Sequence, residues 1–161
     1  METTNELCRI LTQKREVFVR YENETAALLT CPIDDIEQHM KARQQLADEV
    51  DGLDVHIAQL TQKSKEQQKE LELAIKNLCA RQELSPEVQN VFDASQQIFA
   101  VIHRIQRMET NVQERIQYEQ KMLLEKIKQL NRSTTAKASK YYGKTGISET
   151  NNFFPFHSKK A

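Results

Sequence analysis

The side chains best able to bind a metal ion are scattered along the chain without the spacing of a ligand set. They are four histidines and three cysteines: His39, His56, His103, His157, Cys8, Cys31 and Cys79. The nearest pairing joins Cys31 to His39 across an expected helix start and brings no further ligand. We therefore expect no metal site, and the odd number of widely spaced cysteines indicates reduced thiols rather than a disulfide framework.

The acidic residues that could bind calcium lie inside an expected helix. Asp48, Glu49, Asp51 and Asp54 surround Gly52 but lack the spacing of an EF-hand loop, so a solvated helix face explains them better. No serine–histidine–acid, cysteine–histidine or glycine-rich phosphate arrangement is recognisable. Because slender helical hairpins rarely form water-excluding pockets, we expect neither an enzyme nor a cofactor.

The composition favours helices and argues against nucleic acid as a partner. Among 161 residues, Gly and Pro each occur 3 times, and Lys+Arg and Asp+Glu balance at 23 each. A balanced chain lacks the overall field that attracts nucleic acid or an anionic membrane. The N-terminus has no basic segment followed by an apolar run, and no apolar stretch approaches the roughly 18 residues of a bilayer span. These features predict a cytoplasmic protein that does not insert into a membrane.

Apolar residues that recur at intervals of three and four predict three helices, over residues 4–29, 34–80 and 86–130. Pro32 ends the first helix, and Ser85-Pro86 starts the third, with the serine side chain expected as its N-terminal cap. The second and third helices extend about 70 Å each, so the short loop between them makes them antiparallel neighbours. We expect an all-α fold, an elongated antiparallel three-helix bundle or coiled-coil hairpin over residues 1–131.

The apolar seam is weaker in two places. The segment QKSKEQQKE, residues 62–70, should stay helical but pack loosely. The distal half of the third helix carries a broad apolar surface of Met108, Met122, Leu123, Leu124 and Ile127. Since the first helix extends only about 40 Å, it covers one end of the hairpin and leaves part of the stripe for an amphipathic helix from another protein.

Residues 132–161 lose the heptad pattern and predict a basic tail that is flexible when free. Six Lys or Arg residues stand there against one acid, Glu149. Tyr141-Tyr142 and the segment FFPF, residues 153–156, are aromatic spots of a kind that disordered tails seldom contain, which indicates docking to a partner. Six cations without a folded platform would give only weak, salt-sensitive contact with nucleic acid.

Taken together, these features resemble the FlgN-type flagellar export chaperones of bacteria, up to about residue 150. The resemblance rests on the chain length, the short first helix, and the acidic start DDIEQHMKARQQLADEVDGLD of the second helix. It rests also on the long third helix and on Tyr142-Gly143-Lys144-Thr145-Gly146, which is similar to a Tyr-Gly-x-x-Gly stretch that often follows the last long helix in the family. The terminal FFPFHSKKA has no counterpart in this resemblance.

The resemblance implies a cytosolic, ATP-independent chaperone of the flagellar type III secretion system. Such a chaperone binds the C-terminal helical segments of hook–filament junction proteins, prevents their premature assembly and delivers them to the membrane-embedded export gate. For the client helix it points to Ile116, Met122, Leu123, Ile127 and Leu130. For docking to the export gate it points to Tyr141 or Tyr142.

Two alternatives stay open at this point. The hairpin could be a self-associating coiled-coil scaffold that buries its exposed stripe in a symmetric homodimer. It could also be an adaptor for a different motility or secretion client, such as the filament cap. Light scattering would identify the scaffold, and binding to the other client alone would identify the adaptor.

Overall fold

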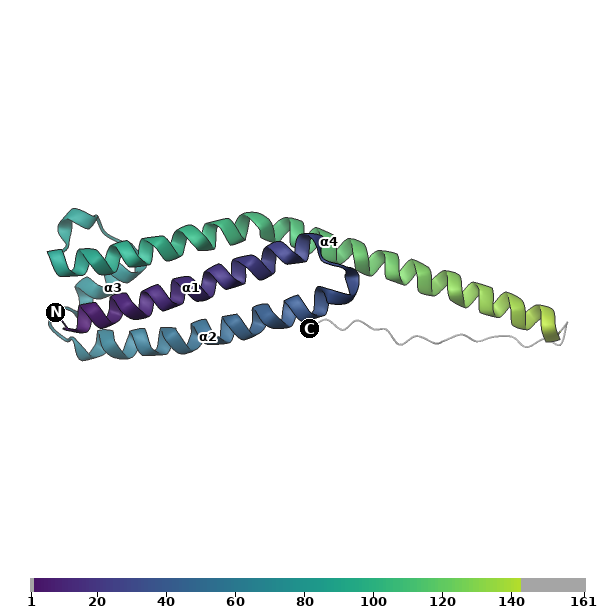
Figure 1. The fold of residues 1–161 in the computed structure, drawn as a ribbon, viewed down its shortest axis with the longest axis horizontal. Coiled ribbons are helices and arrows are strands. Elements are labelled where there is room, and N and C mark those ends of the chain that lie inside the picture. Colours follow the sequence, from purple (N-terminus) through teal and green to yellow (C-terminus); the bar gives the residue numbers. More distant parts are fainter. Residues whose placement is uncertain (1, 143–161) are drawn as a thin grey trace. The chain divides into compact units, whose positions relative to one another are not determined.

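The computed structural model describes residues 2–142, with side chains to residue 140, and shows an all-α protein (Figure 1). No strand occurs within that range. The helical elements are α1 (Glu2–Thr30), the 3-10 turn η1 (Ile33–Asp35), α2 (Ile36–Lys63), α3 (Gln68–Lys76), the 3-10 turn η2 (Arg81–Glu83) and α4 (Pro86–Tyr142). The chain forms two compact units, Met1–Arg115 and Ile116–Ala161, and the first of them is a helical bundle.

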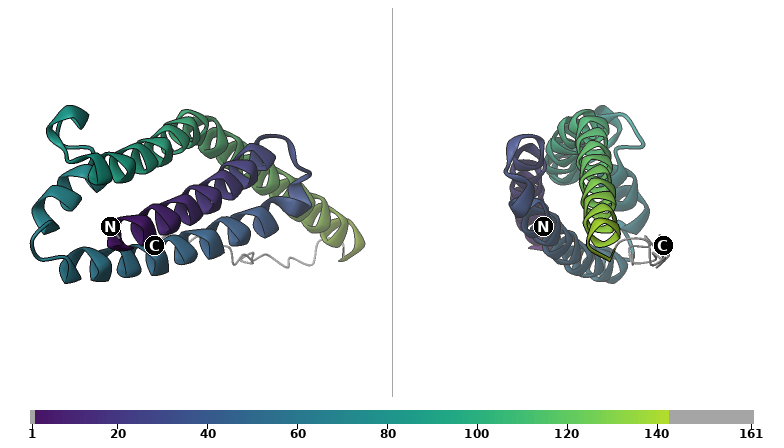
Figure 2. Two further views of the ribbon diagram at one scale, coloured as in Figure 1. Left: turned by 60° about the vertical axis from the view of Figure 1, so that its left-hand side comes forward. Right: turned by 90° about the vertical axis from the view of Figure 1, so that its right-hand side faces the viewer.

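Ion pairs define how α1 and α2 run in the bundle. Arg20 Nη2 lies 3.0 Å from Glu49 Oε2, and Lys14 Nζ lies 2.6 Å from Asp54 Oδ1. Residue numbers rise along one helix as they fall along the other. The two helices are therefore antiparallel neighbours, as Figures 1 and 2 show.

The part of α4 inside the bundle runs in the same direction as α1. Arg104 donates hydrogen bonds of 2.7 and 2.9 Å to the two carboxylate oxygens of Glu22. Further along both helices, Arg115 donates to the backbone carbonyls of Leu28 and Cys31. Residue numbers rise together, so α4 is parallel to α1 and antiparallel to α2. The expected all-α antiparallel bundle is confirmed, with α2 as the reversed member.

The core follows the predicted apolar stripes. Its central cluster consists of Leu7, Ile10, Leu11, Ile57, Leu71, Ala74, Leu84, Val88, Val91, Phe92 and Ile98. Burying one large aliphatic side chain stabilises a fold by roughly 1.5–3 kcal/mol. Because the cluster joins α1, α2, α3 and the start of α4, it holds the bundle together at the end where α3 lies.

The helix predicted over residues 34–80 is divided, which corrects the expectation of one continuous helix. α2 ends at Lys63, the backbone of Ser64 leaves the helical region with φ −94° and ψ 64°, and α3 begins at Gln68. The hydroxyls of Thr61 and Ser64 donate to carbonyls four residues earlier, at 2.8 and 3.3 Å, a contact that bends helices. The segment around the break offers no apolar side chain, so breaking it sacrifices no core contact.

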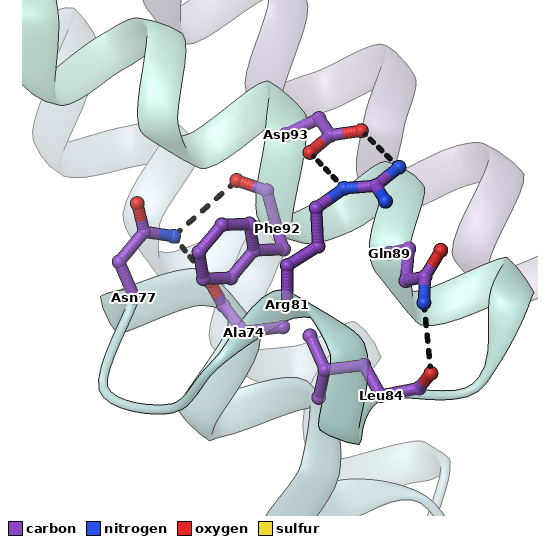
Figure 3. A network of polar contacts seen from close by, with 7 residues as sticks. All are labelled: Ala74, Asn77, Arg81, Leu84, Gln89, Phe92 and Asp93. Atoms are coloured by element: carbon purple, nitrogen blue, oxygen red, sulfur yellow. Dashed lines mark hydrogen bonds and ion pairs between the residues drawn. The ribbon is translucent and has the colours of Figure 1, made fainter.

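α3 also ends earlier than predicted, at Lys76, because Asn77 closes it. Asn77 adopts a left-handed conformation with φ 53°, a shape that asparagine tolerates at helix ends. Its side-chain nitrogen donates to the carbonyls of Ala74 at 2.8 Å and Phe92 at 3.3 Å (Figure 3). The same turn is joined to α4 by Arg81, whose guanidinium donates to both carboxylate oxygens of Asp93.

Helix α4 begins at Pro86 as predicted, but without the expected serine cap. The Ser85 hydroxyl is buried and makes no hydrogen bond to any of the described residues. The Ser85 backbone carries the start instead: its amide donates to Glu70 Oε1 at 2.6 Å, and its carbonyl accepts from the amide of Gln89 at 3.0 Å. Pro86 thus marks the start of α4, and Glu70 of α3 binds the backbone amide of the residue before it.

Helix α4 extends to Tyr142, so the predicted helix end at residue 130 and the tail start at residue 132 are wrong. The expectation relied on the loss of apolar periodicity after Leu130, but residues 131–142 contain neither proline nor glycine to stop a helix. The first such residue is Gly143. The rest of the predicted tail, with the FFPF segment, lies outside the described residues.

Candidate interaction surface

The predicted partner-binding residues lie on the distal segment of α4, defined here as residues 116–142. At 3.6 residues per turn, Ile116, Leu123, Ile127 and Leu130 fall within about 60° of one another and form a seam. Met122 and Leu124 flank that seam on opposite sides. These six side chains are called the distal face below.

The side chains of the distal face are accessible. Leu123 is 54% exposed, Leu130 66%, Leu124 47% and Met122 40%, while Ile116 and Ile127 are partly exposed. No residue from 116 to 140 is buried. Large apolar side chains at helical spacing, exposed over four turns, are a feature of surfaces that bind a partner.

The bundle segment of α4, residues 86–115, has the same periodicity and the opposite burial. Its inward side chains are all at most 8% exposed: Val88, Val91, Phe92, Ile98, Val101, Ile105 and Val112. The periodicity predicts core positions at Val91, Ile98, Ile102 and Ile105. Three of them are buried, and Ile102 is partly buried against the core cluster. The same apolar periodicity of α4 is therefore buried in the bundle segment and exposed in the distal segment.

Arg115 stands at the end of the bundle segment. Its guanidinium donates to the carbonyl of Leu28 at 2.9 Å and to that of Cys31, and it approaches Cys31 Sγ at 3.5 Å. The last carbonyls of a helix have no partner within the helix, so an arginine that binds them satisfies the C-terminus of α1. Arg115 thereby attaches α4 to the end of α1.

A second polar contact, not foreseen from the sequence, joins partly buried side chains of three helices in the bundle. Arg43 of α2 donates to both carboxylate oxygens of Glu109 at 3.0 and 3.1 Å and to Thr25 Oγ1 at 3.3 Å. Its guanidinium carbon also lies 4.8 Å from the centre of the Tyr21 ring. A signal was present, because Arg43 lies three residues from both Met40 and Leu46 in the apolar stripe of the sequence. The contact ties three helices together and explains why an arginine stands in the seam.

Arginine contacts also change the acidity of carboxylates in the bundle. Hydrogen bonds from Arg104 hold the pKa of Glu22 below its ordinary value, and hydrogen bonds from Arg81 do the same for the pKa of Asp93. Burial raises the pKa of the Cys8 thiol, with the charge of Asp93 adding to the effect. A raised pKa makes that thiol less reactive.

The two tyrosines predicted to dock at the export gate are the last residues of α4. Tyr141 and Tyr142 belong to the helix, and their side chains lie outside those described. Their predicted role therefore stays a prediction.

Other candidate sites give no geometry to build on. Among the described side chains, no three His, Cys, Asp or Glu residues come together as a possible metal site. Cys8, Cys31 and Cys79 are free thiols. Within residues 2–142 no helix is both long and apolar enough to traverse a bilayer.

Comparison with known proteins adds no relative from which a function could be inferred. No family model, curated protein or solved structure matches the chain.

Proposed function

We propose that the protein is a cytoplasmic chaperone of the flagellar export system. In this proposal it binds the C-terminal helical segments of hook–filament junction proteins and delivers them to the export gate. The observation that carries the proposal is the distal face, where Met122, Leu123, Leu124 and Leu130 are each at least 40% exposed on one helix. The resemblance of the sequence to FlgN-type chaperones supplies the identity of the client.

The physical demands on such a chaperone agree with a single exposed helix face. Unassembled filament proteins expose apolar heptads, and an apolar seam on another helix covers them by helix–helix packing. Release has to be easy, so a limited interface with adaptable side chains such as Met122 suits the task better than a deep groove. The bundle holds residues 86–115 of the same helix through the core.

Isothermal titration calorimetry with purified C-terminal fragments of the junction proteins tests client binding. We expect one-to-one binding at micromolar or tighter affinity with a negative heat-capacity change, because apolar surface is buried. Absence of heat at several temperatures would remove the chaperone proposal. If light scattering then showed a dimer at all concentrations, the scaffold alternative would replace it. Binding to a filament-cap fragment alone would assign the other client.

Delivery is tested separately from capture. Replacing Tyr141 and Tyr142 by Ala should leave the affinity for the junction-protein fragment unchanged and impair secretion of the client in cells. Replacing Tyr118, which is 58% exposed on α4, by Ala is the matched control. Equal loss of binding and secretion in the Tyr141/Tyr142 variant would contradict the separation of capture from delivery.

A further inference from the structure

The two units of the chain differ strongly in charge, although the whole chain is neutral. Residues 1–115 contain 14 Lys or Arg and 20 Asp or Glu, which leaves six negative charges in excess. Residues 116–161 contain nine Lys or Arg and three Asp or Glu, which leaves six positive charges in excess. The exposed apolar face is therefore presented by the basic unit.

The positive charge is concentrated beside and beyond the distal face. From residue 126 to residue 142 the helix carries no acidic residue and five exposed cations: Lys126, Lys128, Arg132, Lys137 and Lys140. No acidic residue lies within four positions of Arg132, Lys137 or Lys140, so ion pairs along the helix do not neutralise them. The helix dipole accounts for a cation in the last turn, such as Lys140, but its effect does not reach Lys126 or Lys128.

Two of these cations stand next to the apolar seam. On a helix of 3.6 residues per turn, Lys126 and Lys137 lie about 60° and about 40° from Leu123, on the same side. Charged residues in such flanking positions select the partner helix, because opposite charges on the partner are attracted and like charges are repelled. The seam thus selects a partner with an apolar stripe, and the flanking cations select a partner with acidic residues beside that stripe.

We propose that the distal segment of α4 binds an amphipathic helix that carries acidic residues beside its apolar stripe. The inference rests on the proposed function for the location of the site, and it adds the chemistry by which a client is chosen. The apolar stripe of the client covers Leu123, Ile127 and Leu130. Its acidic flank pairs with Lys126 and the cations that follow.

A partner helix explains these features better than an anionic membrane does. Polar residues interrupt the distal face on both sides of the seam: Lys126 lies between the seam and Met122, and Gln120 and Asn131 lie between the seam and Leu124. Helices that lie on membranes instead have a broad, continuous apolar face rich in Trp, Phe and Leu. Residues 116–142 contain neither Trp nor Phe. A second copy of this chain in parallel register is also disfavoured, because it would bring the same cations together.

The test uses two designed peptides on the full-length protein. Both are four-heptad helices with the same Ile and Leu seam; one carries Glu and the other Lys at the flanking positions. At about 50 mM salt we expect the Glu peptide to bind at least about tenfold tighter than the Lys peptide, and the difference to shrink at about 500 mM salt. Equal affinities at low salt would overturn the inference.

Charge-reversal variants test whether the cations of the distal segment cause the preference between the two peptides. The variant Lys126→Glu/Arg132→Glu/Lys137→Glu should reverse the preference between the two peptides. A matched control, Lys65→Glu/Lys69→Glu/Arg107→Glu, changes three exposed cations of the bundle by the same amount and should leave the preference intact. Loss of preference in the control and not in the distal variant would contradict the assignment. Binding to phosphatidylglycerol vesicles without binding to either peptide would assign the face to a membrane.

Junction-protein fragments titrated under the same conditions separate this inference from the proposed function. If the fragments bind with an affinity that neither salt nor charge reversal changes, the charge inference fails and the chaperone proposal stands. If only the Glu peptide binds, the charge inference stands and the junction proteins are the wrong clients.

Discussion

The bundle segment and the distal segment of α4 share one helix and one apolar period, and they differ in what surrounds them. Ile98 in the bundle segment is 3% exposed, whereas Leu123 in the distal segment is 54% exposed. Apolar periodicity therefore predicts which face of a helix is apolar, but it does not predict whether that face is buried. The bundle segment is covered by its neighbouring helices and ends at Arg115, which binds the carbonyls of Leu28 and Cys31 at the end of α1.

The largest expected difference is in the free energy of unfolding, when an isoleucine is replaced by alanine in the bundle segment or in the distal segment. Ile98→Ala removes buried side chain from the core and should lower the free energy of unfolding by about 2–5 kcal/mol. Ile127→Ala, on the distal face, should change it by less than about 0.5 kcal/mol. Chemical denaturation followed by circular dichroism measures both. Equal losses would show that the distal face is also core.

Arginines give the next comparison. Arg115→Ala leaves the carbonyls of Leu28 and Cys31 without this donor and should destabilise the bundle by about 1–3 kcal/mol. Arg132→Ala is the control, since Arg132 is exposed on the distal segment and should have an effect below about 0.5 kcal/mol. Thermal unfolding of both variants checks the expectation. An unchanged midpoint for Arg115→Ala would mean that the end of α1 is held by its apolar contacts alone.

The smallest expected effect is the pH dependence of stability, which arises from two carboxyl groups of the bundle. The pKa values of Glu22 and Asp93 are lowered from their ordinary values of 4.5 and 3.8 by hydrogen bonds from Arg104 and Arg81. A lowered folded-state pKa stabilises the fold above the unfolded-state pKa, and the stabilisation is lost as pH falls through the folded-state pKa.

Thermal midpoints measured from pH 7 down to below the ordinary values of the two carboxyls should therefore decline, by a few degrees at most, because solvent reaches both ion pairs and screens them. The variant Glu22→Gln/Asp93→Asn should start lower and decline less. A steeper acid response in that variant than in the unaltered protein would contradict the role of the two pairs.

The sequence predicted the parts of the fold that depend on local signals. Pro32 fixed the end of α1 near Thr30, Pro86 fixed the start of α4, and the apolar stripes identified most of the core. The break between Lys63 and Gln68 was missed because every residue there tolerates a helix. Local hydroxyl contacts of Thr61 and Ser64 accompany the break, together with a tertiary contact that the sequence does not show: Leu71 and Ala74 of α3 are fully buried in the core cluster.

Two further misses have equally specific causes. The end of α4 was placed at residue 130 because apolar periodicity stops there, but residues 131–142 continue the helix without an apolar stripe, and they contain neither proline nor glycine. Arg43 was overlooked because an arginine in the seam reads as a surface residue unless its partner is known, and its partner Glu109 is 66 positions away. For the distal face, the sequence identified the residues and the structure gives their exposure; that they bind a client remains the proposal.

The most direct test of the account is the variant Leu123→Asp/Ile127→Asp, measured for both unfolding and client binding. We expect a thermal midpoint close to that of the unaltered protein, most of its helicity, and no detectable heat with the junction-protein fragment. Charges on an exposed face cost little stability but prevent apolar docking. Cooperative unfolding of the variant at ambient temperature would assign both residues to the core and contradict the account.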